Sequence, residues 1–214
     1  MSSGACEDSG QAAPLYIAAV AGLLFLALIF FTFGEADIQR NGAQSAADAA
    51  ALAAAKESRS LLESDLKAHL TDPDYFEYVF NAPFPGGPGN ACGKASAFAA
   101  LNKARVVRCR QLSDGRWGYE VSLKSDKGMS TDLIPGTEGK QAEAEAVAVV
   151  EPRCRFIPDP DSDPGSDQDA DPDAAAASIG KVRCDGGPDW SLDPEDLALM
   201  PGVADLFSVR LAED

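Results

Sequence analysis

The cysteines are the residues of this 214-residue chain best suited to covalent chemistry. Cys6 lies near the N-terminus, and the other four are Cys92, Cys109, Cys154 and Cys184. Zinc sites use close pairs such as CxxC, and the spacings of 17, 45 and 30 residues between these four offer none. An even set of four cysteines in sequence rich in proline and glycine is typical of an oxidised domain outside the cytoplasm. We therefore predict two disulfides.

Four cysteines allow three disulfide connectivities, and we predict the sequence-local one. A Cys92–Cys109 bridge would tie the start of a helical segment to the strand that follows it. A Cys154–Cys184 bridge would close off, at its base, the acidic stretch between these two residues. Each bridge would contribute about 3 kcal/mol by restricting the unfolded chain.

Carboxylates that could bind a cation concentrate in residues 159–173, DPDSDPGSDQDADPD, which contain seven aspartates and no base. An EF-hand calcium loop needs glycine at its sixth position and glutamate at its twelfth. Counted from Asp159, those positions hold Pro164 and Ala170, so the pattern fails. A stretch without apolar residues has nothing to bury. We predict a disordered acidic loop over 158–178 and no metal site, with weak calcium binding as the alternative.

The sequence contains no pattern that indicates catalysis. GxSxG, HExxH, P-loop and GxGxxG motifs are absent. The single histidine, His69, falls in the polar end of a predicted helix, where a solvated position is expected. The tryptophans Trp117 and Trp190 are expected to be core or interface anchors. We predict a protein that is not an enzyme and needs no cofactor.

The formal net charge of −16 restricts the partners. Nucleic acid phosphates demand lysine and arginine, so nucleic acid binding is excluded. The same charge disfavours docking of the domain on anionic lipid headgroups. It fits a well-solvated surface, or one that meets a basic partner or divalent cations.

One apolar segment is long enough to cross a bilayer. Residues 15–33, LYIAAVAGLLFLALIFFTF, carry no charge, and a helix of this length reaches ~29 Å. A cleavable signal peptide needs a positive n-region, but residues 1–39 contain no lysine or arginine. We therefore predict an uncleaved single-pass anchor. All four predicted disulfide cysteines follow it, which places the N-terminus in the cytoplasm and the C-terminal domain outside.

The anchor continues into a predicted alanine-rich helix that ends before Pro73, with Leu62, Leu66 and Leu70 on one face. Residues 74–80 are aromatic and are predicted as a short strand or an arm. Trp117, Tyr119, Val121 and Leu123 alternate along a half-buried strand. The other predicted elements are a helix at 92–104, strands at 105–112, 116–124, 141–151, 179–184 and 207–211, a hairpin turn at Asp114-Gly115 and a short helix opening at Asp193-Pro194-Glu195.

Together these features predict an α+β protein. A single N-terminal transmembrane helix continues into a long Ala-rich helix, and a small disulfide-stapled antiparallel sheet with covering helices follows. The predicted boundaries are a short N-terminal segment at 1–14, the transmembrane helix at 15–33, the Ala-rich amphipathic helix at 34–71 and an extracytoplasmic α+β domain at 72–214.

The N-terminal segment resembles a known family. GQAAPLYIAAVAGLLFLALIFF followed by QRNGAQSAADAAALAAA is similar to the TadE/TadG-like proteins of Tad (Flp-type) pilus assembly systems. The later segment GTEGKQAEAEAVAVVEPRC resembles the distal domain of the same family with lower specificity. The resemblance implies a single-pass membrane protein that acts as a minor pilin-like or accessory component. Its partners would be membrane lipid and other pilus-assembly or pilin-like membrane proteins, met through the N-terminal helix.

Small side chains in the continuation of the anchor suit close helix–helix approach. The function predicted from the sequence is therefore a structural or assembly component of a Tad-type pilus or a related secretion system. The alternative is a membrane-anchored extracytoplasmic module that binds a ligand or a cation through the acidic loop and the Trp117 face. The resemblance does not extend to the von Willebrand A-type domain of longer relatives, because the DxSxS metal motif is absent.

The resemblance also generates a prediction about processing at Gly10 and Gln11. Pilin-type processing cuts after a glycine that precedes a helix with glutamate at its fifth position. Counted from Gln11, the fifth position is Leu15, so we expect that Gly10 is not processed efficiently. Mass spectrometry of protein purified from membranes should find residues 1–10 still attached. A dominant species that begins at Gln11 would contradict this expectation.

Overall fold

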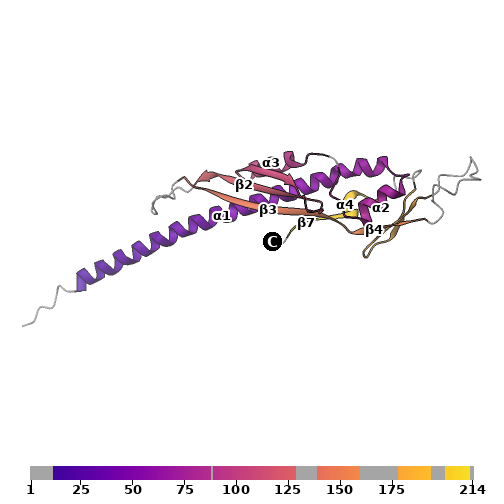
Figure 1. Cartoon of the computed structure of the whole chain (residues 1–214). Helices are drawn as coiled ribbons and strands as arrows, with labels where there is room; N and C mark the ends of the chain where they lie inside the picture. The colour runs from indigo at the N-terminus through magenta and orange to yellow at the C-terminus, as the bar shows by residue number, and fades with distance from the viewer. Residues whose placement is uncertain (1–11, 88, 129–138, 160–177, 194–200, 213–214) are drawn as a thin grey trace, which may run out of the picture.

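The computed structural model describes residues 12–87, 89–128, 139–159, 178–193 and 201–212. A long helix, α1 (Ala12–Ala68), runs through the whole molecule. Figure 1 shows that its N-terminal half projects alone, while its C-terminal half lies along a sheet. The α+β class, the N-terminal apolar helix, the antiparallel strands and the two disulfides are all as predicted.

The packed half of α1 is built from alanine. Eight of the nine alanines between Ala43 and Ala55 are buried, and so are Leu62 and Leu66 further along the helix. This half packs against strand β3 (Gln141–Pro152), strand β2 (Gly118–Gly128) and helix α3 (Cys92–Leu101). Because alanine has the smallest side chain after glycine, the sheet and α3 can both approach the backbone of α1 closely. The predicted Leu62, Leu66 and Leu70 face is confirmed as core.

Residues 74–80 form a helix, so the prediction of a short strand or an arm is wrong. Helix α2 (Pro73–Asn81) begins after Asp72, whose carboxylate accepts a hydrogen bond from the Tyr75 amide at 3.1 Å. Pro73 occupies the first turn, where its missing N–H costs nothing. Phe76, Val79 and Phe80 are buried at helical spacing. The Asp72 cap and the helical spacing of the buried residues therefore outweigh the preference of aromatic residues for strands.

Four antiparallel strands form the larger sheet in the order β1-β2-β3-β7, with β1 (Ala104–Gln111) and β7 (Phe207–Leu211) at its edges. The alternation predicted for β2 is confirmed, because Tyr119, Val121 and Leu123 point into the core. The pairing of β1 with β2 shifts between Val106 and Arg108, so Val107 is the extra residue of a bulge. The shift turns Cys109 inward, where strict alternation from Ala104 would point it outward.

A smaller antiparallel sheet lies at the other end of the molecule from the N-terminus of α1 (Figure 1). Its strands are β4 (Cys154–Pro158), β5 (Gly180–Cys184) and β6 (Asp189–Ser191). Helix α2 packs on β4, and a short helix, α4 (Val203–Leu206), leads into β7. The strands therefore divide into two sheets where the sequence suggested one, because the ladder of the larger sheet ends at Pro152 and Arg153 separates β3 from β4.

The disulfides have the sequence-local connectivity. Cys92–Cys109 joins the first residue of α3 to β1, and Cys154–Cys184 joins directly opposed residues of β4 and β5. The acidic loop predicted at 158–178 falls almost wholly outside the described residues, and so does the helix predicted to open at Asp193-Pro194-Glu195.

The packing of α1 gives a prediction. Replacing Ala50, which is fully buried, with leucine should overpack the contact between α1 and its neighbours and destabilise the domain by about 1–3 kcal/mol. Ser45→Leu, at an exposed position of the same helix, is the matched control and should have little effect. Thermal unfolding followed by circular dichroism in detergent would measure both. Equal melting temperatures for the two variants would contradict the packing described here.

Candidate functional site: the exposed apolar half of the long helix

The most distinctive surface of the protein is the N-terminal half of α1. Its residues Ala13–Phe30 have a mean hydropathy of 2.4, and none of them is buried in the protein. Leu23, Leu24, Phe25 and Leu26 are consecutive, so apolar side chains point in every direction around the helix. Among the described residues this is the one helix long and apolar enough to cross a membrane. A core helix would be mostly buried, so this segment is not part of the core of this chain.

The folded domain begins to contact α1 a short distance beyond this segment. Gln39 Nε2 donates to the Gly128 carbonyl oxygen at 3.3 Å, and Gln44 Nε2 donates to the Glu145 carbonyl oxygen at 3.2 Å. Ala36, Gln39 and Lys140 line a small crevice between α1 and the start of β3. The end of the larger sheet therefore lies beside residues 36–44 of α1. The length of helix between these residues and the apolar half sets the distance between the sheet and that half.

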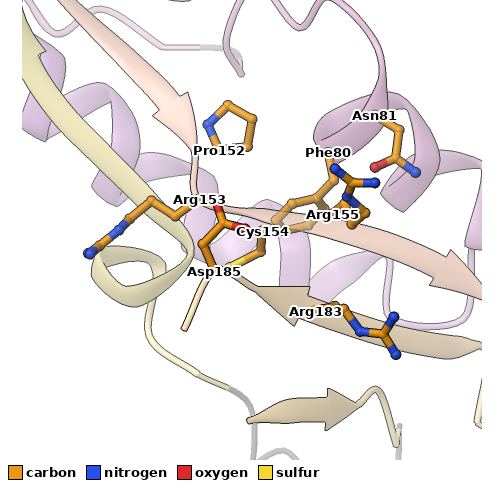
Figure 2. Close-up of a pocket in the computed structure, with 8 residues that line it drawn as sticks. All are labelled: Phe80, Asn81, Pro152, Arg153, Cys154, Arg155, Arg183 and Asp185. Atoms are coloured by element: carbon orange, nitrogen blue, oxygen red, sulfur yellow. The ribbon is translucent and has the colours of Figure 1, made fainter. Parts of the chain in front are cut away.

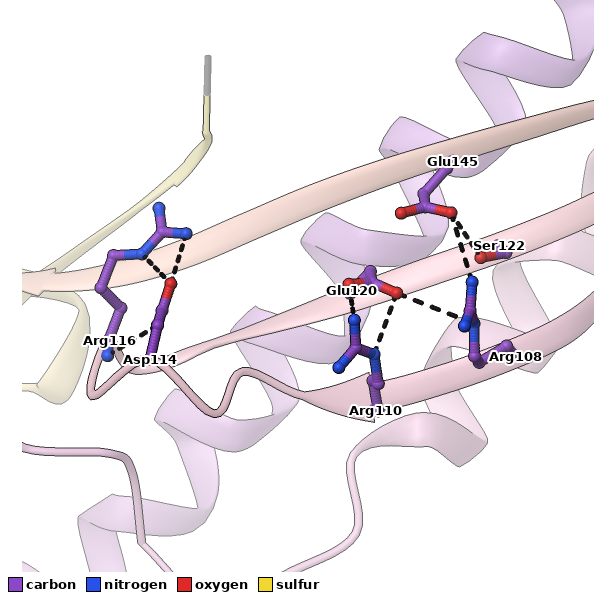
Figure 3. Close-up of polar contacts among 7 residues, drawn as sticks. All are labelled: Arg108, Arg110, Asp114, Arg116, Glu120, Ser122 and Glu145. Carbon is purple, nitrogen blue, oxygen red and sulfur yellow. Dashed lines mark hydrogen bonds and ion pairs between the residues drawn. The ribbon is translucent and has the colours of Figure 1, made fainter. Parts of the chain in front are cut away.

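The outer face of the larger sheet carries a network of ion pairs (Figure 3). Arg110 Nε donates to Glu120 Oε1 at 3.0 Å, and Arg108 Nε lies 3.7 Å from the same oxygen. Arg108 also lies 3.6 Å from Glu145, which accepts a hydrogen bond from Ser122. The hydrogen bond with Glu120 raises the pKa of Arg110. Glu120 is buried, and the two arginines neutralise its charge, so the network is explained by ion pairing within the sheet.

Glu151, near the end of β3, is a second carboxylate that one arginine holds through two hydrogen bonds. Arg210 Nε donates to Glu151 Oε2 at 2.8 Å, and a second guanidinium nitrogen donates to Oε1 at 2.6 Å. This hydrogen bonding lowers the pKa of Glu151, and the positive charges of Arg210 and Arg116 lower it further. Because Arg210 lies on β7, the pair fastens the last described strand to β3.

A surface pocket of about 440 Å³ lies where α2, β4 and β5 meet. Figure 2 shows that the guanidinium groups of Arg153, Arg155 and Arg183 do not converge on a common point. Arg183 is engaged by Asp189 through three hydrogen bonds of 2.8 to 3.2 Å. Asn81 is occupied as well, since its amide bonds both the N–H and the C=O of Phe156. A ligand pocket needs polar groups aimed at one place, so this pocket does not define a binding site.

The structure also places the other residues considered from the sequence. Trp117 is only 3% exposed, and its indole N–H donates to Ser58 Oγ at 2.8 Å, so the Trp117 face is core and not a ligand surface. His69 lies just beyond α1, half exposed, with its ring stacked 4.2 Å from that of Tyr75. Among the described residues no group of three histidine, cysteine, aspartate or glutamate side chains could hold a metal ion. Gly10 and Gln11 lie outside the described residues.

Comparison with protein families supports the exposed half of α1 as the functional feature. Residues 10–57 match the family described as "Putative Flp pilus-assembly TadE/G-like". The match confirms the resemblance identified from the sequence and covers the apolar half of α1 together with its alanine-rich continuation. No curated protein and no solved structure gives a match. The family is one of pilus assembly, so the match suggests a Tad-related assembly component.

The Glu151–Arg210 pair predicts a pH effect. The folded-state pKa of Glu151 lies below its unfolded value of about 4.3, so the pair stabilises the fold above that pH and the stabilisation disappears as pH falls through the folded pKa. Glu151→Gln should therefore lower the melting temperature at pH 7 and matter progressively less from about pH 5 to pH 2. Asp37→Asn, at an exposed position of α1, controls for the loss of one surface charge. A gap between wild type and Glu151→Gln that stays constant over this range would contradict the assignment.

Proposed function

We propose that this protein is a non-enzymatic, membrane-anchored structural or assembly component of a Tad-type pilus or a related secretion system. In this proposal α1 spans the cell membrane once, with the N-terminus in the cytoplasm and the disulfide-linked domain outside. The protein would act as a minor pilin-like or accessory component that meets its membrane partners through the N-terminal helix.

The contrast between the two halves of α1 is the observation that carries the proposal. One continuous helix changes from fully exposed and apolar, at 13–30, to buried and alanine-rich, from Ala43 onward. An apolar surface of this size is not stable in water, so lipid or another apolar helix must cover it. The family match to residues 10–57 spans both halves, which supports a role in pilus assembly.

The rest of the described surface supports a structural role. The ion pairs on the larger sheet neutralise one another, and the pocket beside Arg153 has no convergent groups. The two disulfides fit an oxidising compartment, which supports placement of the domain outside the cytoplasm.

The proposal predicts the effect of charges within the apolar half. Leu24→Lys with Leu28→Lys should move the protein out of the membrane fraction, because each lysine near the centre of a membrane helix costs about 3 kcal/mol. Leu24→Ala with Leu28→Ala is the matched control and should remain in the membrane after alkaline extraction. A reporter that works only outside the cytoplasm, fused after Asp214, should be active in the wild type and in the alanine control.

Two results would count against the proposal. Wild-type protein that is released by alkaline extraction would refute anchoring by α1. Activity of a cytoplasm-only reporter fused after Asp214 would refute the orientation while leaving the anchor intact.

A further inference from the structure

The end of the domain nearest the apolar half of α1 carries exposed cations. Lys127 precedes Gly128, the last residue of β2, and Lys140 precedes Gln141, the first residue of β3. Gly128 and Gln141 are paired with each other, so both lysines lie at the same end of the larger sheet.

Two further cations lie beside these lysines. The carbonyl oxygen of Lys103 accepts a hydrogen bond from the Asp126 amide at 2.8 Å, so Lys103 lies next to the end of β2. Arg40 follows Gln39, whose side chain bonds the carbonyl oxygen of Gly128. We call Arg40, Lys103, Lys127 and Lys140 the basic end.

The cations of the basic end are exposed, and within the described part of the chain none of them forms an ion pair. Lys124, in the same region, is instead paired with Glu143 at 2.6 Å. The other acids described near this end are Glu35, Asp37 and Asp126. Cations therefore outnumber unpaired acids among the described residues here, although the whole chain has 34 acids and only 18 lysines and arginines.

Two apolar side chains are also left uncovered at this end. Leu101, two residues before Lys103, is 78% exposed, and Ile38, two residues before Arg40, is 74% exposed. They are the most exposed of the large apolar residues described beyond the apolar half of α1. Exposed apolar residues flanked by long cationic side chains are typical of a surface that lies in a membrane interface.

The rise of α1 sets the height of the basic end. Ala36 and Gln39, which line a crevice with Lys140, follow Phe33 by three and six residues. At about 1.5 Å per residue, the crevice lies ~5–9 Å beyond the end of the apolar run. The headgroup layer extends ~5–8 Å beyond the hydrocarbon core on each side of a bilayer. Lys140 therefore lies at the level of the lipid headgroups or just above them.

We propose that the basic end rests on the phospholipid headgroups of the bilayer that holds α1, and that anionic lipid strengthens this contact. The lysines and Arg40 donate to lipid phosphates while Ile38 and Leu101 enter the interfacial layer. A tilt of α1 toward α3, within the ~20° usual for membrane helices, lowers Leu101 and Lys103 toward the headgroups. The inference rests on the proposed function, because α1 must span a membrane to bring this end to its surface.

Local charge, and not the net charge of −16, decides this contact. Charges farther apart than the Debye length, ~8 Å at physiological ionic strength, are largely screened from one another. Seven of the aspartates lie in residues 159–173, which connect strands β4 and β5 of the smaller sheet. Those strands lie at the other end of the domain from the basic end (Figure 1). The headgroups therefore meet the cations of the basic end and not the acidic stretch.

Fluorescence quenching by a headgroup-labelled lipid measures the contact. The full-length chain carries Cys6→Ser and Asn102→Cys, is labelled with a fluorophore at position 102, and is reconstituted into phosphatidylcholine vesicles that contain a lipid with a quencher on its headgroup. Adding phosphatidylglycerol should increase quenching about twofold at low salt. Salt at about 1 M should abolish the increase, because the Debye length there is only ~3 Å. Repulsion by the net charge would instead decrease quenching.

A label at the far end of the domain reports whether the whole domain lies down on the bilayer. Tyr78→Cys, on helix α2, replaces Asn102→Cys in this sample, and its label should not be quenched in either kind of vesicle. Quenching at position 78 that matches quenching at position 102 would overturn the proposal.

Charge reversal makes the test specific. Lys127→Glu with Lys140→Glu should remove the increase in quenching at position 102. Lys56→Glu with Lys181→Glu is the matched control, since it changes the net charge equally at exposed positions away from the basic end, and it should keep the increase. Equal responses of the two double variants, or no increase in the labelled parent, would overturn the proposal. Only protein that floats with the vesicles is measured, so failure of the anchor is seen separately from failure of this contact.

Discussion

The close approach of the alanine face of α1 to the larger sheet and to α3 is the contact on which the rest of the structure depends. Alanine contributes little apolar area per residue, so this contact gains stability from its length and from dense packing. Aromatic side chains of the core gather toward the C-terminal end of α1, where the Phe207 ring stacks on that of Phe80 and meets Trp117 edge-on.

Two irregularities in the strands allow this sequence to form the two sheets and the core. They are a bulge in β1 and a break between β3 and β4. The bulge at Val107 changes which face of β1 its later residues use, and this change points Cys109 toward α3 while Arg108 and Arg110 face solvent. Without the extra residue, the arginines would enter the core and the disulfide could not form. Similarly, the pairing of the larger sheet ends with Pro152 opposite Phe207, and the break at Arg153 lets β4 pack against α2.

Long periodic patterns were predictable from the sequence, and short competing ones were not. The apolar and alanine-rich halves of α1, the alternation in β2 and the local disulfides follow from composition, period and spacing. The helix at residues 74–80 was not predicted from the sequence. Aromatic content favours a strand there, while the Asp72 cap and Pro73 favour a helix. The faces that α2 and α3 leave exposed could not be recognised from the sequence, since only the fold shows which side of a short helix its neighbours cover.

The continuity of α1 links the two halves of the molecule mechanically. Gly34 and Gly42 bracket the segment between the apolar run and the first buried alanine, Ala43, and an added side chain at either glycine would meet nothing within 4 Å. Each glycine lowers helix stability by about 1 kcal/mol relative to alanine. Ala36 and Gln39 of this segment contact the end of the larger sheet, whereas the alanine face beyond it is buried, so we expect α1 to bend more readily here than beyond Ala43. A bend there changes the tilt of the domain without disturbing either the apolar half or the alanine face.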